Sequence, residues 1–285
     1  MKKNWLNGKT VVISGASGGI GFNISKILIN KYDCKIIGIG RNEEKFLKNI
    51  QTLGDKKDNF SYRLFDISIK ENWFKFATEL TNKNIKVDLL INNAGFMLPF
   101  LKLDDITDSD IEEIINTNLT SYVFATKYML PVLRKSSNPA IINVSSAAGL
   151  SPVVGESLYC LTKFGVRGFT ETLQQDFHKK IYVAGVYPGF IKTNLMDRME
   201  ISDKQNGIID KVMMPVEKVT KKIVKGISKK KKRIVLGLDG KSMHFLYRLF
   251  PKKGPGLIRN VLKVSKLEMF ENIFDYKENT KWKEF

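Results

Sequence analysis

Short apolar runs alternate with longer stretches in which apolar residues recur every three or four positions. The runs are rich in β-branched residues, which is typical of buried strands. They occupy residues 9–14, 35–40, 61–65 and 87–91. After the first run, Phe22, Ile24 and Leu28 recur at the spacing of an amphipathic helix. Strands that alternate with helices in this way predict an α/β fold built on a doubly wound parallel sheet.

A glycine-rich turn joins the first predicted strand to the first predicted helix. It reads Ser14-Gly15-Ala16-Ser17-Gly18-Gly19-Ile20-Gly21. Glycines in this context let the backbone approach a pyrophosphate, and the helix N-terminus offers unpaired N–H groups and the positive end of its dipole. The spacing is G-x-x-x-G-x-G instead of the commoner G-x-G-x-x-G, so an ordinary glycine-rich turn is the alternative. The context favours a dinucleotide-binding site.

The end of the second strand indicates which dinucleotide binds. A site that prefers NAD usually places an Asp or Glu about 20 residues beyond the glycine turn, where it binds the ribose 2′-OH. Here that place holds Gly40, and Arg41 follows. A 2′-phosphate meets no carboxylate at this place, and a guanidinium can bind it through charge-assisted hydrogen bonds. An ordinary loop arginine is the alternative, but the pattern favours NADP(H).

Tyr159 and Lys163 form a Y-x-x-x-K pair within a predicted helix. Residues four apart lie on one helix face, with roughly 5–6 Å between Cβ atoms. There the lysine can stabilise a phenolate and lower the tyrosine pKa from about 10 toward neutral pH. Such a tyrosine exchanges a proton with a carbonyl or carbinol oxygen. Taken alone, the pair also fits a solvated lysine beside a half-buried tyrosine.

Taken in order, these motifs resemble those of the short-chain dehydrogenase/reductase family over residues 8 to about 235. The glycine turn is similar to the family's T-G-x-x-x-G-I-G, with Ser14 keeping the hydroxyl of the usual Thr. Ser146 stands thirteen residues before Tyr159, the usual separation of the catalytic serine. Four further segments resemble family motifs: Asp66-Ile67, Asn92-Asn93-Ala94-Gly95, Asn116-Thr117-Asn118-Leu119 and Tyr187-Pro188-Gly189-Phe190-Ile191-Lys192-Thr193.

The resemblance implies a role for each matching residue. Ser146, with Ser145 as the fallback, is expected to donate a hydrogen bond to the substrate oxygen, and Tyr159 to act as general acid/base. Lys163 is expected to lower the tyrosine pKa and to bind the nicotinamide ribose, and Asn118 to hold a water that links Lys163 to solvent. The implied catalytic residues are Asn118, Ser146, Tyr159 and Lys163. The implied cofactor-binding residues are Gly15, Ser17, Gly19, Ile20, Gly21, Arg41, Asp66, Ile67, Asn93, Ala94, Gly95, Tyr159, Lys163, Pro188, Gly189, Ile191 and Thr193.

Length and cysteine content agree with an intracellular enzyme. The 285 residues suit one α/β domain with a large core. The sequence shows neither a charged-then-apolar leader nor a run approaching 18 apolar residues, so we expect a cytoplasmic protein without a membrane span. Cys34 and Cys160 lack metal-site spacing and are expected to be reduced thiols, so no metal is expected. Neither His178 nor His244 is needed for the chemistry.

The net charge of +18 is concentrated near the C-terminus. Residues 216–285 hold 19 of the 47 Lys and Arg residues but only 7 of the 29 Asp and Glu residues. A solvated turn explains the basic run at 229–233, and the lack of interleaved aromatic residues in that run argues against nucleic-acid binding.

The segment beyond this run mixes aromatic and aliphatic residues with basic ones. That pattern is typical of an interfacial helix on an anionic membrane, and equally of a helix that covers a substrate site with its lysines outside. We therefore divide the chain into a Rossmann-type dinucleotide-binding and catalytic domain over 1–238 and a basic, amphipathic helical extension over 239–285.

The predicted function is an oxidoreductase that transfers a hydride between NADP(H) and a carbonyl or secondary alcohol. Apolar residues at the family's substrate positions favour a hydrophobic ketone or alcohol, such as a steroid, a lipid or a long-chain ketone, although they could also pack the site shut. These residues are Phe96, Leu98, Phe100, Val153, Val154, Leu158, Leu195, Met196, Met199, Met213 and Met214. The alternative is a catalytically silent NADP(H)-binding sensor or scaffold. Family resemblance also implies a homodimer or homotetramer through the helices around 108–133 and 157–177.

Overall fold

Seven parallel strands form the central sheet of the computed structural model, which describes residues 4–192, 213–265 and 267–274. The strands are β1 (Thr10–Ser14), β2 (Lys35–Gly40), β3 (Phe60–Leu64), β4 (Leu89–Asn92), β5 (Ala140–Val144), β6 (Tyr182–Pro188) and β9 (Arg233–Leu236). Their order is β3-β2-β1-β4-β5-β6-β9, and each neighbouring pair is parallel. The chain runs outward from β1 to β3 and returns beside β1 at β4. That reversal is the switch point at which open α/β sheets bind ligands.

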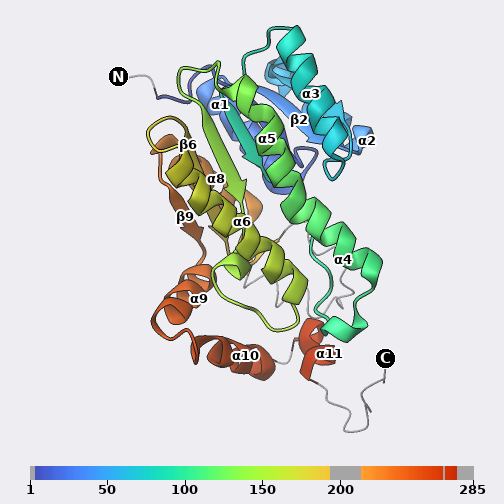
Figure 1. Ribbon diagram of the computed structural model, residues 1–285, viewed down its shortest axis with the longest axis vertical. Helices are drawn as coiled ribbons and strands as arrows, with labels where there is room; N and C mark the ends of the chain where they lie inside the picture. The colour runs from blue at the N-terminus through green and yellow to red at the C-terminus, as the bar shows by residue number, and fades with distance from the viewer. Residues whose placement is uncertain (1–3, 193–212, 266, 275–285) are drawn as a thin grey trace.

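Helices cover both faces of this sheet (Figure 1). On one face lie α1 (Gly19–Tyr32), α2 (Glu43–Gln51) and α8 (Val216–Ser228), and on the other α3 (Lys70–Asn82), α5 (Ser121–Leu133) and α6 (Ser157–Asp176). Side chains alternate along a strand, so Val11 and Ile13 join the first apolar core and Val12 joins the second. The doubly wound α/β fold predicted from the sequence is confirmed.

Shorter elements shape the loops at the carboxyl ends of the strands. They are the α-helix α4 (Asp108–Ile115), the π-helix η3 (Asn116–Thr120), the strand pair β7 (Ile191–Lys192) and β8 (Met214–Pro215), and the 3-10 helices η2 (Leu103–Asp105), η4 (Ala147–Gly149) and η6 (Glu268–Phe270). The 3-10 helix η1 (Gly54–Asn59) lies instead at the amino end of β3. The π-helix joins α4 directly to α5. A π-helical turn inside a longer helix is rare and is frequently found at functional sites.

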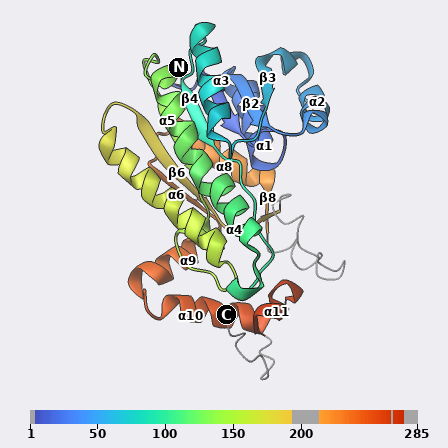
Figure 2. The same cartoon turned by 45° about the vertical axis from the view of Figure 1, so that its right-hand side comes forward.

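Three helices near the C-terminus lie beyond the carboxyl ends of the strands (Figure 2). They are α9 (Leu238–Leu249), α10 (Gly254–Ser265) and α11 (Glu271–Phe274). Met243, Ile258 and Ile273 on these helices are buried in a third apolar cluster, together with Phe100 after β4 and Ala148 after β5. The C-terminal helices thus pack on the loops where the sheet ends. Within the described residues, none of the helices has the length and apolar character that a membrane span requires.

Candidate active site

The loops after β1 and β4 are bound to each other at the switch point. The Ser14 hydroxyl accepts hydrogen bonds from the backbone N–H groups of Asn93 (3.0 Å) and Ala94 (3.1 Å), and the Asn93 side-chain amide donates to Ser14 O (2.9 Å). Gly15 has a φ of +67°, and a Cβ there would lie 2.8 Å from the Ala94 Cα. A Cβ on Gly21 would overlap the Gly15 carbonyl oxygen.

This packing leaves a cradle of bare backbone at the start of α1. The N-cap of α1 is Gly18, which has no side chain to satisfy the N–H groups of the first turn. Such a terminus binds phosphate through those N–H groups and the helix dipole. The cradle therefore fits the pyrophosphate of a dinucleotide.

Arg41 and Asp66 lie together where β2 and β3 end. The Arg41 Nη1 is 3.2 Å from the Asp66 Oδ2, and the Arg41 side chain is 71% exposed. Burial raises the pKa of the Asp66 carboxyl, but hydrogen bonds from Ser68 and the charge of Arg41 outweigh it and lower the pKa overall. Asp66 thus anchors a guanidinium that is open to solvent and available to an anionic ligand.

Tyr159 and Lys163 lie one turn apart on α6, and both are buried. The Lys163 Nζ lies 5.4 Å from the centroid of the Tyr159 ring and 5.7 Å from that of the Tyr122 ring. It also donates a long hydrogen bond of 3.4 Å to Val144 O at the end of β5. Burial lowers the pKa of the Lys163 ammonium to about 8.

The expected lowering of the Tyr159 pKa is wrong for this structure. Burial of the phenol raises its pKa and outweighs the hydrogen bond from Ser146, which lowers it. The cause is desolvation, which penalises the charged phenolate. Tyr159 is therefore protonated at neutral pH, the state in which it can donate a proton.

Asn118, the centre of the π-helix, is bonded to the loop after β4. Its Oδ1 accepts a hydrogen bond from Phe96 N (2.9 Å), and its Nδ2 donates one to Phe96 O (2.7 Å). A Cβ on Gly95 would lie 2.9 Å from the Asn118 Oδ1 and 3.4 Å from the Lys163 Nζ. The glycine thus allows Asn118 and Lys163 to approach the loop after β4.

The two serines after β5 have different surroundings. The Ser145 hydroxyl donates to Lys163 O (2.8 Å), so its proton is already used within the protein. The Ser146 hydroxyl accepts from Ala148 N (3.2 Å) as the N-cap of η4, and its own proton points to the Tyr159 hydroxyl in the cavity instead of to the backbone. This geometry favours Ser146 over Ser145 as the donor to a substrate oxygen.

A cavity with about 840 Å³ of space, its open mouth included, lies at the carboxyl ends of the central strands. Many of the residues predicted from the sequence line it: Ile20, Asn93, Gly95, Phe100, Ser145, Ser146, Val153, Tyr159, Lys163, Pro188, Gly189 and Ile191. Asn118 lies behind this lining, against Gly95. Arg41 and Asp66 lie outside the lining, at the ends of β2 and β3. Thr193, Leu195, Met196 and Met199 fall outside the described residues.

The order of the motifs matches a known family. The profile of the family described as short chain dehydrogenase matches residues 9–204. This chain belongs to the short-chain dehydrogenase/reductase family. The resemblance inferred from the sequence is thereby confirmed.

Its relatives include reductases and dehydrogenase-like proteins. The 3-oxoacyl-acyl-carrier-protein reductase FabG of Rickettsia felis is 29% identical over 241 residues, which cover 84% of this chain and 95% of the relative. The 11-beta-hydroxysteroid dehydrogenase-like 4A of Arabidopsis thaliana is 29% identical over 206 residues, which cover 70% and 67%. The crystal structure of actinorhodin polyketide ketoreductase with NADPH shares the fold, with a TM-score of 0.70 at 22% identity, covering 82% of this chain and 96% of that one.

The C-terminal helices of this short-chain dehydrogenase/reductase close one side of the cavity. Met243 of α9 lines it, and Phe270 packs edge-on against Phe100 with 4.6 Å between ring centroids. The Asp239 carboxylate, also on α9, accepts a hydrogen bond from Phe190 N (2.6 Å). That bond fixes the loop after β6 against the extension.

Sequence reasoning missed a carboxyl group in the cavity wall. Glu156 lines the cavity and is 5% exposed, although it is an ionisable residue. The only sequence signal was its place three residues before Tyr159, and a single glutamate at that distance says nothing about burial.

Proposed function

We propose that this protein is an NADP(H)-dependent reductase of carbonyl groups on hydrophobic substrates. The observation that carries the proposal is the convergence of Ser146, Tyr159 and Lys163 on one apolar cavity beside the glycine cradle. Other walls of the cavity are apolar, as Phe100, Val153 and their neighbours show. Such a site excludes water and favours a hydrophobic ketone.

The same part of the structure supports a proposal for how the cofactor binds. The cradle at Gly15 and Gly21 holds the pyrophosphate, and Arg41 binds the 2′-phosphate. The further cofactor contacts are those expected from the sequence: Ser17, Gly19, Ile20, Asp66, Ile67, Asn93, Ala94, Gly95, Pro188, Gly189, Ile191 and Thr193. When bound, NADP(H) supplies the hydride, while the protein binds, orients and moves the proton.

Side chains of the protein polarise the carbonyl and transfer the proton. Ser146 donates a hydrogen bond that polarises the substrate carbonyl, and Tyr159 donates the proton that the developing alkoxide takes up. Lys163 binds the cofactor ribose and stabilises the tyrosinate that is left. Asn118 holds a water that reconnects Lys163 to solvent. The reduction direction agrees with a Tyr159 that is protonated at neutral pH.

The chemical class of the substrate is suggested by relatives of this chain. FabG of Rickettsia felis carries the name of a 3-oxoacyl-acyl-carrier-protein reductase, and the Arabidopsis thaliana relative that of a steroid dehydrogenase-like protein. Both names describe ketones or alcohols on large apolar molecules. We therefore place 3-oxoacyl thioesters first among the substrates to be tested and ketosteroids second.

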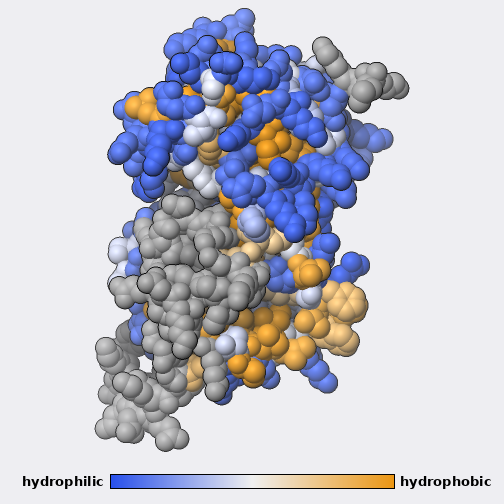
Figure 3. Space-filling view, turned by 180° about the vertical axis from the view of Figure 1, so that it is seen from behind, coloured by the Kyte–Doolittle hydropathy of each residue, from blue (hydrophilic) through white to orange (hydrophobic). Residues whose placement is uncertain are grey.

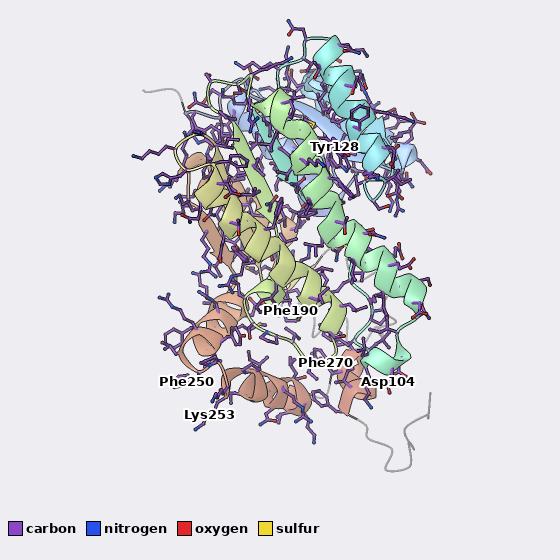
Figure 4. The ribbon with its side chains drawn as sticks, viewed as in Figure 1. Asp104, Tyr128, Phe190, Phe250, Lys253 and Phe270 are labelled. Atoms are coloured by element: carbon purple, nitrogen blue, oxygen red, sulfur yellow. The ribbon has the colours of Figure 1, made fainter. Side chains whose placement is uncertain are left out.

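The substitution Tyr159→Phe tests the reaction. It should lower turnover of the best ketone in such a panel by at least about 100-fold, the contribution of a general acid, while the dissociation constant of NADPH changes little. Tyr128→Phe, on the outer side of α5 (Figure 4), is the matched control and should leave both unchanged. Substantial turnover by the Tyr159 variant would remove that residue from the acid/base role. Tight NADPH binding without turnover of any ketone by the unaltered protein would favour the sensor or scaffold alternative.

A second proposal concerns the outer surface of the C-terminal helices. Exposed apolar side chains of α9 and α10 form an apolar patch at the lower right of Figure 3, interspersed with exposed basic ones. We call this surface the C-terminal face. Its residues are Leu238, Lys241, Phe245, Arg248, Leu249, Phe250, Lys252, Lys253, Leu257, Arg259, Val261, Lys263 and Val264.

We propose that the protein is cytoplasmic and that the C-terminal face contacts an anionic membrane surface. The apolar side chains can insert among the lipid headgroups, and the lysines and arginines around them attract the negative charges of an anionic membrane.

We further propose a homodimer or homotetramer formed through the α4–α5 and α6 surfaces, where Val123 and Leu161 are exposed. Sedimentation velocity tests the oligomeric state.

A further inference from the structure

Glu156 is the N-cap residue of α6, the helix that carries Tyr159 and Lys163. Its side chain lines the cavity, and the residue is 95% buried. The backbone carbonyl of Glu156 accepts a hydrogen bond from Cys160 N (2.7 Å), so the helix begins normally. The side-chain Oε1, in contrast, is buried with no hydrogen-bond partner among the described residues.

A buried carboxyl oxygen without a hydrogen-bond partner is costly, because water no longer solvates it. Groups of this kind are rare in folded proteins and call for an explanation. The same cavity wall contains apolar residues such as Val153 and Phe100, whose side chains offer no hydrogen bond. Nothing in the proposed proton path from Ser146 through Tyr159 to Lys163 uses it.

The protonation state of Glu156 decides what it can bind. Burial raises the pKa of this carboxyl well above its ordinary value. A negative charge at Glu156 would also raise the pKa values of Tyr159 and Cys160, which shows that its carboxyl is close to both. Because burial disfavours the charged form, it favours the neutral carboxylic acid, which can donate one hydrogen bond.

We propose that Glu156 forms a second binding subsite, in which its carboxyl donates a hydrogen bond to an oxygen acceptor next to the reacting carbonyl. The site then selects 3-oxoacyl thioesters and other 1,3-dicarbonyl compounds over simple ketones. Ser146 and Tyr159 bind the oxygen that is reduced, and Glu156 binds the second oxygen. This inference rests on the proposed reductase function, whose substrate it specifies.

The subsite explains why a costly group persists in the wall. A buried donor left unpaired discriminates strongly against ligands that cannot satisfy it. A dicarbonyl substrate satisfies Glu156, whereas a simple ketone of the same length leaves it unpaired. The unpaired carboxyl thus lowers the stability of the protein but gives it selectivity for dicarbonyl substrates.

The experiment compares two substitutions on two substrates. Glu156→Met removes the donor at similar size, and Glu156→Gln is the matched control, because its amide still donates. The substrates are a 3-oxoacyl N-acetylcysteamine thioester and a simple ketone of equal chain length, each reduced with NADPH. Glu156→Met should lower kcat/KM for the thioester by about 10-fold or more relative to its effect on the simple ketone. Glu156→Gln should keep most of the preference for the thioester.

Stability gives an independent measurement on the same variants. Because Glu156→Met removes an unpaired buried polar group, its Tm should rise by about 2–4 °C. A fall in Tm would mean that the protein itself satisfies the carboxyl, and it would overturn the proposal. Equal losses of kcat/KM on both substrates would also overturn it. A loss with Glu156→Gln as large as that with Glu156→Met would overturn it too, because it would indicate an ion pair.

Failure of the reductase function can be told apart from failure of the subsite. If the unaltered protein reduces no ketone, the proposed function fails. Calorimetry then tests whether the subsite exists. It measures how tightly the protein saturated with NADP⁺ binds a 3-hydroxyacyl N-acetylcysteamine thioester and a matched secondary alcohol. Weaker binding of the thioester alone by Glu156→Met supports it, and equal binding by both proteins overturns it.

Discussion

Arg41 is the residue on which the choice between the two nicotinamide cofactors depends. Its guanidinium is exposed and is anchored by Asp66, so a 2′-phosphate can reach it from solvent. We expect Arg41→Ala to weaken NADPH binding by about 1.5–3 kcal/mol, the contribution of a hydrogen bond to a charged group. NADH, which lacks the phosphate, should bind almost as before. Fluorescence titration of both cofactors measures the two affinities.

Arg134→Ala is the matched control for Arg41, because Arg134 is exposed and follows the C-terminal end of α5. It should leave both affinities unchanged. Equal losses for NADPH and NADH in the Arg41 variant would show that the side chain supports the loop instead of the phosphate.

Individual residues were predictable where their chemistry depends on spacing along the chain. Tyr159 and Lys163 share a helix face, and the structure does place them one turn apart. The pKa of Tyr159 was not predictable, because desolvation by the surrounding fold exceeds the local effects that a sequence displays. The burial of Glu156 was not predictable either, because residues distant in the sequence, such as Met243 of α9, line the same cavity.

Among the elements, η6 has three residues and α11 has four, so side-chain packing fixes their position more than their own backbone hydrogen bonds do. Phe270 is 2% exposed against Phe100, and Ile273 lies so close to Gly155 that a Cβ there would approach it to 2.8 Å. Phe270 lies by α11, below the end of α6 (Figure 4). Phe270 and Ile273 thus pack η6 and α11 against Phe100, which lines the cavity, and against Gly155.

Phe270→Ala should release η6 and α11 from Phe100 without unfolding the sheet. Loss of a buried phenylalanine costs about 3 kcal/mol, and a peripheral element responds by opening locally. We expect faster amide hydrogen exchange over residues 267–274 and a higher KM for the ketone, with the exchange of the β-sheet unchanged. Phe245→Ala, whose ring on α9 is 60% exposed, is the control and should change neither. Faster exchange throughout the sheet would show that the C-terminal helices are part of the main cooperative unit.

Elements with a strong apolar pattern were predicted to within one or two residues. The strand expected over 61–65 spans Phe60–Leu64, and that expected over 87–91 spans Leu89–Asn92. The π-helix at Asn116–Thr120 was not predicted, because the bonds of Asn118 to Phe96 join distant parts of the chain. The apolar periodicity of a segment does not predict contacts with residues far away in the sequence.

At the scale of the whole molecule, charge and apolar surface come together at one end. The sequence places its basic excess in the last quarter of the chain, and the fold carries α9 and α10 beyond the carboxyl ends of the strands. Phe250 and Lys253 lie at the outer turn between these helices (Figure 4). A molecule bound to a membrane through this end would hold the covered side of its cavity near the lipid.

Binding to vesicles tests this orientation. Co-sedimentation with vesicles of phosphatidylserine and phosphatidylcholine should be strong at low salt and should weaken as salt screens the charges. Removing two lysines by Lys252→Gln and Lys253→Gln should weaken binding by about 2 kcal/mol, since each lysine near the surface contributes about 1 kcal/mol. The control pair Lys45→Gln and Lys48→Gln removes the same charge from exposed positions on α2. If both pairs weaken binding equally, net charge alone drives it, and if the unaltered protein stays in the supernatant, the C-terminal face has another partner.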